Sequence, residues 1–368
     1  MKIESVELRE VRADLRFRFE TSFGVERDLT KVVLVLRSGG LEGYGEVTAG
    51  NVPGYSYETS ATAWAALSEY VLPQVVGRDF ATPAQLLDAV RRVRGHNMAV
   101  GALECAFWDL QAKAAGLPLW QLLGGVRTSI AVGASLGIQP TVEETVEVAQ
   151  RHAAEGYRRL KFKIKPGWDV EPLRAVREAL PDMPMTVDAN SAYSLTDARV
   201  FAALDELRLD YIEQPLSHDD LVDHAALQSR LATPVCLDES VHSAADARKA
   251  LALGACRVIN VKVGRVRGLL EARRLHDVAM AFGAPVWCGG MLELGIGRAL
   301  NLHLSTLPNF TLPGDTASAT RYWGDEDIVE ERLDAVDGVQ SLPASGPGLG
   351  VTLRRDLIER KTVRVLEV

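Results

Sequence analysis

Eight short apolar segments recur at near-constant spacing between residues 126 and 320, and they alternate with stretches whose apolar residues follow helical spacing. The segments are IAVGAS, RLKFKI, MTVDAN, DYIEQP, VCLDES, VINVKV, PVWCGG and NFTLPG. Parallel strands need crossover connections, and a helix between two strands makes a right-handed one. The pattern therefore predicts a (β/α)8-type barrel of the α/β class, and it fits an open doubly wound sheet less well.

The part of the chain before these segments is organised differently. Strands are predicted at 2–13, 31–38 and 43–49, and helices at 56–75, 84–94 and 98–115. Gly116 and the pair Gly124-Gly125 are typical helix ends, which places a domain boundary near residue 126. A chain of 368 residues also exceeds the roughly 250 to 300 that one core supports. We therefore expect an α+β domain at 1–125 and the barrel at 126–320, with the strand-like VTL and VRVLEV of 321–368 packing back on the first domain.

The net negative charge of the chain argues against polyanionic partners. The net charge is −8 and the pI is about 5.5, with no stripe of Lys and Arg, so we expect neither nucleic acid nor a membrane as a partner. No apolar run reaches the roughly 18 residues of a membrane span, and the first residues lack the apolar core of a signal peptide. These features indicate a cytoplasmic protein. Its four cysteines lie far apart without a CxxC pair, which is typical of buried free thiols.

Several predicted barrel strands end on a charged residue in a regular register. Asp188, Glu213 and Asp238 follow one another at intervals of 25 residues, and Lys262 comes 24 residues later. This spacing places them at the carboxyl ends of the third to sixth strands. In barrels of this kind, that rim carries the active site.

Three carboxylates that converge at one mouth repel one another unless protons or a cation neutralise them. An all-oxygen site formed by Asp188, Glu213 and Asp238 suits a hard divalent ion, Mg²⁺ first, with Mn²⁺ or Co²⁺ as alternatives. A structural alternative is that each acid caps the helix that follows its strand. The common register of all three acids favours metal binding.

The second barrel strand has an unusual charged face. In LKFKIK, the apolar Leu160, Phe162 and Ile164 alternate with Lys161, Lys163 and Lys165. The apolar face of a barrel strand packs against the helices, so we expect Lys161 and Lys163 to point inward and Lys165 to reach out of the end. Buried ammonium groups need acidic partners, and the strand-end acids are available for this. A solvated edge-strand face is the alternative.

Lysines on the second and sixth strands lie on opposite sides of a barrel axis. A substrate carboxylate on the metal would then have Lys163 near one face of its α-carbon and Lys262 near the other. This arrangement suits abstraction of an α-proton, with the metal and a cation stabilising the resulting enediolate. A lysine base must be partly neutral, so we expect the metal and the neighbouring lysine to lower its pKa.

The charged residues described above resemble those of a known group of enzymes. The KxK of Lys161 and Lys163, the three acids and Lys262 resemble the muconate-lactonizing-enzyme subgroup of the enolase superfamily. The longer segments KPGWD, VDAN, IEQPL, CLDES, WCGGMLELGIGRA and PNFTLPGD resemble the N-acylamino acid racemase and o-succinylbenzoate synthase family. The resemblance covers essentially the whole chain. It implies a capping α+β domain over a catalytic barrel, a small-molecule carboxylate substrate and a homo-oligomer.

The resemblance also implies roles for single residues. Lys163 and Lys262 match the two acid/base lysines, Lys161 matches an electrophilic helper, and the three acids match metal ligands. Arg265 either tunes Lys262 by its charge or is a solvated residue of the next helix. The cap loops Phe19–Gly24 and Asn51–Tyr55 either close over the substrate or are ordinary turns. The substrate contacts implied are Ser135, Asn190, Glu239, Gly290, Met291, Phe23 and Tyr55.

The function expected is divalent-metal-dependent racemization of N-acylamino acids, N-succinyl or N-acetyl, by two-base proton transfer. The main alternative is o-succinylbenzoate synthase, a dehydration that shares the first step. Muconate cycloisomerase, a Schiff-base lysine aldolase and a non-catalytic binding protein are more distant alternatives. The eighth-strand segment NFTLPGD disfavours dipeptide epimerases, which carry a D-x-D pattern there.

Two glycine-rich motifs point to other classes but lack the required context. GASLG matches the G-x-S-x-G nucleophile elbow, but Pro140 delays the helix that must follow, and none of the seven histidines ends a predicted strand. SGPGLGVTL leads into a strand instead of a helix, so it is interpreted as a turn and not as a dinucleotide site.

Overall fold

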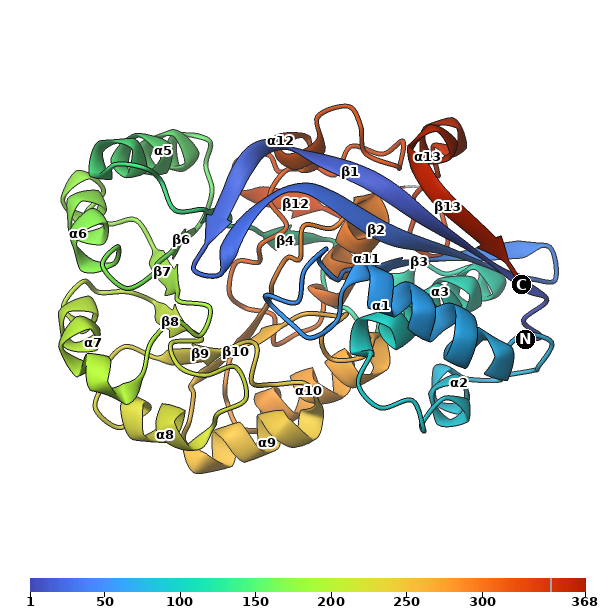
Figure 1. The fold of residues 1–368 in the computed structure, drawn as a ribbon, viewed down its shortest axis with the longest axis horizontal. Helices are drawn as coiled ribbons and strands as arrows, with labels where there is room; N and C mark the ends of the chain where they lie inside the picture. Colours follow the sequence, from blue (N-terminus) through green and yellow to red (C-terminus); the bar gives the residue numbers. More distant parts are fainter. Residues whose placement is uncertain (345) are drawn as a thin grey trace.

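The computed structural model describes residues 1–344 and 346–368, and residue 345, the first of the SGPGLGVTL segment, lies outside this range. The chain folds into a sheet-and-helix cap and a barrel (Figure 1). Both termini lie in the cap, where Val6 and Val368 exchange two backbone hydrogen bonds. Within the described residues, no helix combines the length and the apolar character needed to cross a membrane.

The cap is built on a four-stranded antiparallel sheet in the order β13-β1-β2-β3. Its strands are β1 (Ser5–Thr21), β2 (Gly24–Ser38), β3 (Leu41–Val47) and β13 (Thr362–Glu367). The strands β1 and β2 extend well beyond the predicted ranges and form one long hairpin. Of the two strand-like segments predicted near the carboxyl end, VRVLEV forms β13, whereas VTL contributes only an isolated bridge between Leu353 and Val329.

Helices pack on one face of the cap sheet. The largest is α3 (Asn97–Ala115), whose residues are buried along most of its length against β2 and β3. The predicted helix at 56–75 is instead three consecutive turns of different pitch, α1 (Ser60–Ala65), a π-helical turn at Ala66–Val71 and a 3-10 turn at Leu72–Gln74. The remaining helix of this part is α2 (Pro83–Ala89). A separate apolar core lies between these helices and the sheet.

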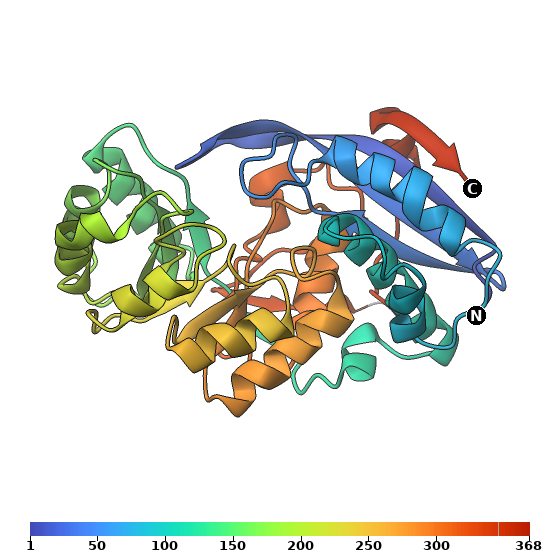
Figure 2. The same ribbon diagram turned by 60° about the horizontal axis from the view of Figure 1, so that its bottom comes forward.

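The barrel is a curled parallel sheet in the order β11-β10-β9-β8-β7-β6-β5, surrounded by helices (Figure 2). This confirms the predicted fold class. The strands are β5 (Ala134–Leu136), β6 (Leu160–Lys163), β7 (Met185–Asp188), β8 (Tyr211–Glu213), β9 (Val235–Leu237), β10 (Val258–Val261) and β11 (Val286–Cys288). The helices are α5 (Val142–Ala154), α6 (Val170–Ala179), α7 (Ala198–Asp205), α8 (Val222–Gln228), α9 (Ala244–Leu253), α10 (Leu269–Ala281) and α11 (Gly295–Leu304).

The predicted first and eighth strands differ from the structure. IAVGAS is split, because β4 (Ser129–Ala131) pairs antiparallel with β12 (Val339–Ser341) and only β5 joins the barrel sheet. NFTLPG forms isolated parallel bridges from Phe310 to Val286 and from Gly314 to Val132, which close the barrel. Pro313 has no amide hydrogen, so this segment cannot form a continuous ladder.

The long β1–β2 hairpin brings the cap to the barrel mouth. In Figures 1 and 2, its tip reaches the region of β6. The backbone carbonyl of Glu20 accepts a 3.0 Å hydrogen bond from the amide of Ile138, and its carboxylate pairs with Lys165 at 3.0 Å. Ser22 donates from its hydroxyl to the backbone oxygen of Asn190 at 3.4 Å. The hairpin therefore covers the carboxyl ends of the barrel strands.

Four short helices complete the chain. They are α4 (Leu119–Leu123), α12 (Ala319–Trp323), α13 (Arg355–Lys361) and a 3-10 turn at Leu195–Asp197. The four cysteines, Cys105, Cys236, Cys256 and Cys288, are buried free thiols, as the sequence predicted.

Candidate active site

The charged face of β6 points into the barrel. Leu160 and Phe162 are buried against the helical layer, while Lys161 and Lys163 contact acids inside the barrel mouth. Lys165, two residues beyond Lys163, lies at the rim, and its side chain is 41% exposed. The prediction of two inward lysines and one that reaches out is confirmed, and the solvated-face alternative is wrong.

Lys161 lies at the centre of a cluster of carboxylates. Its Nζ is 3.2 Å from Asp188 Oδ2, 3.1 Å from Glu213 Oε2 and 2.6 Å from Asp315 Oδ2. It also lies 4.8 Å from the ring centre of Trp287. Burial alone would lower the pKa of Lys161, but the three carboxylates hold that pKa well above its usual value. The three carboxylates therefore favour the charged form of Lys161.

Lys163 is held by two side chains at the end of β7. Its Nζ is 2.6 Å from Asp188 Oδ2 and donates to Asn190 Oδ1 at 2.7 Å. The side-chain Nδ2 of Asn190 donates in turn to Glu239 Oε1 at 3.0 Å. Asn190 and Glu239 therefore orient Lys163 and its acidic partner from the neighbouring strand ends.

Lys262 enters the mouth from the other side. It follows β10, which lies four places from β6 in the sheet. Its Nζ is 2.7 Å from Asp238 Oδ2 and 4.1 Å from the ring centre of Tyr55, a cap residue. Burial lowers the pKa of Lys262, but Asp238 and Tyr55 offset this, so the pKa lies above its usual range.

The expected lowering of the pKa of a lysine base is therefore not observed at Lys262. The physical reason is that the carboxylates face the amines directly, and each ion pair favours the charged amine. A divalent ion on the same carboxylates would weaken these ion pairs, and the neutral base is predicted for that metal-bound state.

Arg265 is a member of the site and not a solvated residue. It is 2% exposed, its guanidinium contacts Asp238 Oδ1, and its Nε donates to the backbone oxygen of Val241 at 2.8 Å. The same Asp238 oxygen accepts a 2.7 Å hydrogen bond from the hydroxyl of Tyr55. Together with Lys262, these groups hold the pKa of Asp238 well below its usual value despite burial.

The three strand-end acids are fully buried at the ends of adjacent strands. Asp188 and Glu213 end β7 and β8, and Asp238 lies one residue beyond β9. The capping alternative is wrong, because the helices that follow begin at Ala198, Val222 and Ala244, well beyond the acids. Burial, followed by the charge of Asp188, raises the pKa of Glu213 to about 8. Negative charge is therefore costly at Glu213, as expected where carboxylates crowd together.

The donor set fits a hard divalent ion in its chemistry, because carboxylate oxygens on adjacent strand ends are what such an ion prefers. Among the residues that the structure describes, no three His, Cys, Asp or Glu side chains converge closely enough to hold a metal as they stand. The Lys161 ammonium lies between Asp188 and Glu213, and Asp238 faces Lys262 and Arg265. Asp188, Glu213 and Asp238 would hold the ion once the side chains of Lys161, Lys262 and Arg265 no longer contact them.

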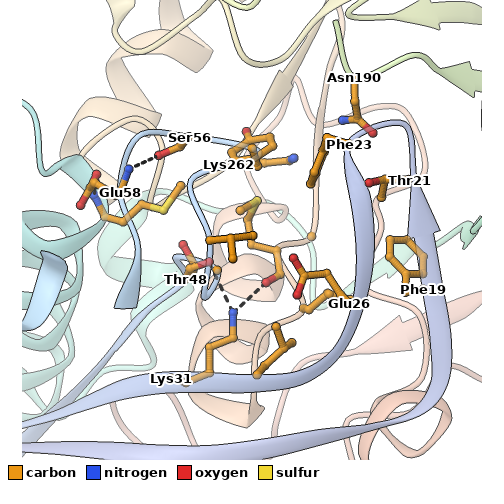
Figure 3. A pocket seen from close by; sticks show the side chains of 18 of the residues that line it. Phe19, Thr21, Phe23, Glu26, Lys31, Thr48, Ser56, Glu58, Asn190 and Lys262 are labelled. Atoms are coloured by element: carbon orange, nitrogen blue, oxygen red, sulfur yellow. Dashed lines mark hydrogen bonds between the residues drawn. The ribbon is translucent and has the colours of Figure 1, made fainter. Parts of the chain in front are cut away.

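A cavity lies between the cap and the barrel mouth. Lys163 and Lys262 both line it, together with five of the predicted substrate contacts: Phe23, Tyr55, Asn190, Gly290 and Met291. Figure 3 shows Phe23 and Asn190 on one side of Lys262 and Ser56 and Glu58 on the other. Ser135 lines an adjoining cavity with Lys161, and Glu239 lines a third one beside Tyr55. The structure thus gathers every predicted site residue at one mouth, and their roles remain predictions.

Several polar residues of the barrel interior were not predicted from the sequence. Asp315 pairs with Lys161 and also accepts from Arg159 at 2.7 Å, and Asn260 donates to Glu213 Oε1 at 2.7 Å. Arg159 and Asn260 lie two residues before Lys161 and Lys262, so the period of two along a strand could have found them. Asp315 follows NFTLPG directly and could have been found as another strand-end acid.

Two protein-family models match the chain. Residues 3–124 match the mandelate racemase / muconate lactonizing enzyme N-terminal domain, and residues 144–357 match the enolase C-terminal domain-like family. The chain is 56% identical to an N-succinylamino acid racemase of Thermus thermophilus, over 99% of this chain and 98% of the relative. It is 50% identical to an o-succinylbenzoate synthase of Geobacillus kaustophilus, over 98% and 96%.

A solved structure of an enolase-superfamily member from Listeria innocua superimposes with a TM-score of 0.96 at 35% identity, covering 100% of this chain and 99% of that one. Members of this superfamily use a divalent metal ion. The agreement extends over both the cap and the barrel. The chain therefore belongs to the enolase superfamily, with the two domains of its mandelate racemase / muconate lactonizing enzyme group.

Proposed function

We propose that the protein racemizes N-acylamino acids, N-succinyl or N-acetyl, by proton transfer between two lysines. One observation carries the proposal: the amines of Lys163 and Lys262 enter the same cavity from strands four places apart, with the acid-bearing strand ends between them. A substrate carbon between two such amines can lose a proton on one face and regain it on the other. The racemase and synthase names of the relatives support this choice of reaction.

Each residue has a role in this proposal. Lys163 removes the α-proton from one enantiomer and Lys262 from the other, and each returns a proton when it acts as the acid. Lys161, whose charge is secured by three carboxylates, lies beside the reacting carboxylate and stabilises the negative charge that develops on it. Asp188, Glu213 and Asp238 would hold a divalent ion, Mg²⁺ first, which would supply further positive charge beside the substrate carboxylate.

The reacting centre is screened from water by the cap. Tyr55 covers Lys262, and the β1–β2 hairpin places Phe19 and Phe23 over the cavity. Excluding water strengthens the interactions between the ammonium groups and the developing negative charge. The proposed substrate is a small-molecule carboxylate, as the names of the relatives suggest, and we expect the working enzyme to be a cytoplasmic homo-oligomer.

The second candidate is o-succinylbenzoate synthase, favoured by the 50% identical relative of that name. Both reactions begin with loss of an α-proton to a lysine. Reprotonation of the intermediate gives racemization, whereas loss of the β-hydroxide gives dehydration. The same residues serve either outcome, so both substrates should be assayed with the same preparation.

The decisive experiment follows α-deuterium uptake by NMR in D₂O with Mg²⁺ and single enantiomers of N-succinyl- and N-acetylamino acids. We expect exchange with inversion, loss of both on treatment with EDTA, and recovery when Mg²⁺ is added back. Exchange that persists without metal, or no exchange on any N-acyl substrate, would contradict the proposal. Borohydride added with substrate tests the Schiff-base alternative and should leave the activity unchanged.

A further inference from the structure

Lys262 lies on a compact loop that follows its strand. β10 ends one residue before it, and residues 262–268 lead to α10; we call this segment the β10 loop. Within the loop, the backbone oxygen of Lys262 accepts from the amide of Val266 at 3.2 Å, and that of Val263 accepts from Gly268 at 2.9 Å. These hydrogen bonds tie the two ends of the loop together, so a displacement of its far end would also displace Lys262.

The cap holds the far end of the β10 loop through Arg267. Its Nη1 donates to the backbone oxygen of Gly95 at 3.1 Å. Its Nη2 donates to the backbone oxygens of Val93 at 3.1 Å and Val90 at 3.3 Å. All three acceptors lie in the segment of the cap that joins α2 to α3. One guanidinium therefore fixes this cap segment and the β10 loop relative to each other.

The helix α3 of the cap contacts the β10 loop at a second point. Nδ2 of Asn97, the first residue of α3, donates to the backbone oxygen of Arg265 at 3.0 Å, and its Oδ1 lies 3.4 Å from Arg267 Nη1. The helix carries a glycine where it meets the loop, and a Cβ on Gly101 would lie 3.0 Å from the backbone nitrogen of Gly268. The two backbones thus pack against each other with no side chain between them.

The backbone of Arg267 adopts a strained conformation. Its φ is +73°, in the left-handed region that a residue with a Cβ seldom adopts, and Gly268 follows with a φ of +116°. Such a conformation persists only where the surrounding contacts hold it. The side chain of Arg267 makes these contacts with the cap. The cap therefore stabilises the conformation of the loop that begins at Lys262.

The other proposed base, Lys163, is held differently. It is the last residue of β6, and the ladder between β6 and β7 pairs it with Asp188. Lys262 lies one residue beyond β10, and the pairing of β10 with β11 ends at Val261. Strand pairing thus fixes the backbone of Lys163, whereas the backbone of Lys262 depends on the β10 loop.

We propose that the cap positions the base Lys262, because Arg267 and Asn97 hold the β10 loop and, through it, the Lys262 amine. Both are positioning residues, since neither lines the cavity that the two lysines share. This inference rests on the proposed racemase function and assigns part of it to the cap. A displacement of about 1 Å at a reacting group can lower a rate about 100-fold. Loosening the loop should therefore impair proton transfer by Lys262 and spare proton removal by Lys163.

The test measures the two proton removals separately in Arg267→Ala. NMR in D₂O with Mg²⁺ follows α-deuterium uptake from each enantiomer of the N-acylamino acid that the unaltered enzyme exchanges fastest. The enantiomer that Lys262→Ala does not exchange is the one that Lys262 deprotonates. We expect its exchange by Arg267→Ala to fall about 10- to 100-fold, and that of the other enantiomer to fall less than about 3-fold. A residue that only joined the cap to the barrel would lower both equally.

Arg177→Ala is the matched control. Arg177, on α6, also donates to several backbone oxygens, among them those of Met183 at 2.7 Å and Leu207 at 3.0 Å. These acceptors precede β7 and β8, at the end of the barrel opposite the mouth. Arg177→Ala should lower the thermal stability, as Arg267→Ala does, and exchange the two enantiomers in the same ratio as the unaltered enzyme.

Hydrogen exchange followed by mass spectrometry tests the loop without any substrate. The peptide that covers residues 262–268 should exchange faster in Arg267→Ala than in the unaltered protein, while the peptide that covers β6 should not change. Asn97→Ala loses one hydrogen bond to the loop and should show both effects to a smaller degree. It takes the place of Arg267→Ala if that variant does not fold.

Three results would overturn the inference while the racemase function stands. They are equal losses for the two enantiomers, unchanged exchange of both, and a 262–268 peptide that exchanges as in the unaltered protein. If the unaltered enzyme exchanges neither enantiomer of any N-acylamino acid, the proposed function is refuted and this inference with it.

Discussion

The hydroxyl of Tyr55, a cap residue, donates a 2.7 Å hydrogen bond to Asp238 of the barrel, while its ring lies 4.1 Å from the Lys262 amine. One side chain of the cap thus contacts a proposed metal ligand and a proposed base at once. The barrel supplies the lysines and the strand-end acids, and the cap completes their surroundings.

Replacing Tyr55 by Phe should separate these two contacts. The ring over Lys262 remains, but Asp238 loses a hydrogen bond to its charged oxygen, which is worth about 1.5 to 3 kcal/mol. We expect kcat/KM for racemization to fall about 10- to 100-fold, with a weaker apparent affinity for Mg²⁺. Tyr57→Phe is the matched control, because Tyr57 is 60% exposed, and it should keep the activity. Equal activity of both variants would show that the hydroxyl of Tyr55 has no role.

A variant that lacks one of the two proposed bases should still exchange the α-proton of one enantiomer. Lys163→Ala and Lys262→Ala should each lower racemization about 10²- to 10⁴-fold, the usual contribution of a general acid or base. Each variant should still exchange the α-proton of one enantiomer, a different one in each case, as measured by NMR in D₂O. Lys249→Ala, at an exposed position on α9 away from the barrel mouth, should racemize normally. Normal racemization by both active-site variants would refute the two-base assignment.

The buried charges around Lys161 should be sensitive to the loss of one partner. Asp315→Asn removes the acid shared by Lys161 and Arg159, which leaves two buried cations undercompensated. We expect the free energy of unfolding to fall by about 3 to 5 kcal/mol. Asp325→Asn removes an exposed partner of Arg332 and should change it by less than about 1 kcal/mol. Denaturant unfolding of both variants gives the comparison, and equal stabilities would contradict it.

A buried glutamate of the cap should make stability depend on pH. Glu104 accepts hydrogen bonds from the backbone amides of Leu269 and Leu270 at the start of α10, and burial raises its pKa from 4.5 to about 7. Between these two values the folded protein keeps a proton that the unfolded chain releases, so stability falls as the pH rises through this window. The loss attributable to Glu104 is about 3 kcal/mol.

Denaturant unfolding between pH 5 and 8 measures this effect. Glu104→Gln carries no titrating group, so its stability should fall less over this range than that of the unaltered protein. Glu178→Gln, at an exposed position on α6, is the control and should follow the unaltered profile. Parallel profiles for all three proteins would contradict the assignment to Glu104.

The barrel and its charged mouth could be predicted because their signals are local. Apolar runs of four to six residues between helical stretches mark buried parallel strands, and the alternation in LKFKIK shows which face of β6 is charged. The first and last strands were mispredicted because their pairing depends on barrel closure. Residues 129–131 pair with β12, far along the chain, and the segment before Gly314 is interrupted by Pro313.

The sequence by itself determined the fold class, the inward lysines of β6 and the strand-end acids, because strand period and spacing along the chain carry that information. Only the tertiary structure decided that Tyr55 and Arg265 share Asp238 and that Asp315 pairs with Lys161. Those contacts join residues from distant parts of the chain. Their geometry arises when the barrel closes and the cap packs over it, and no local pattern records either event.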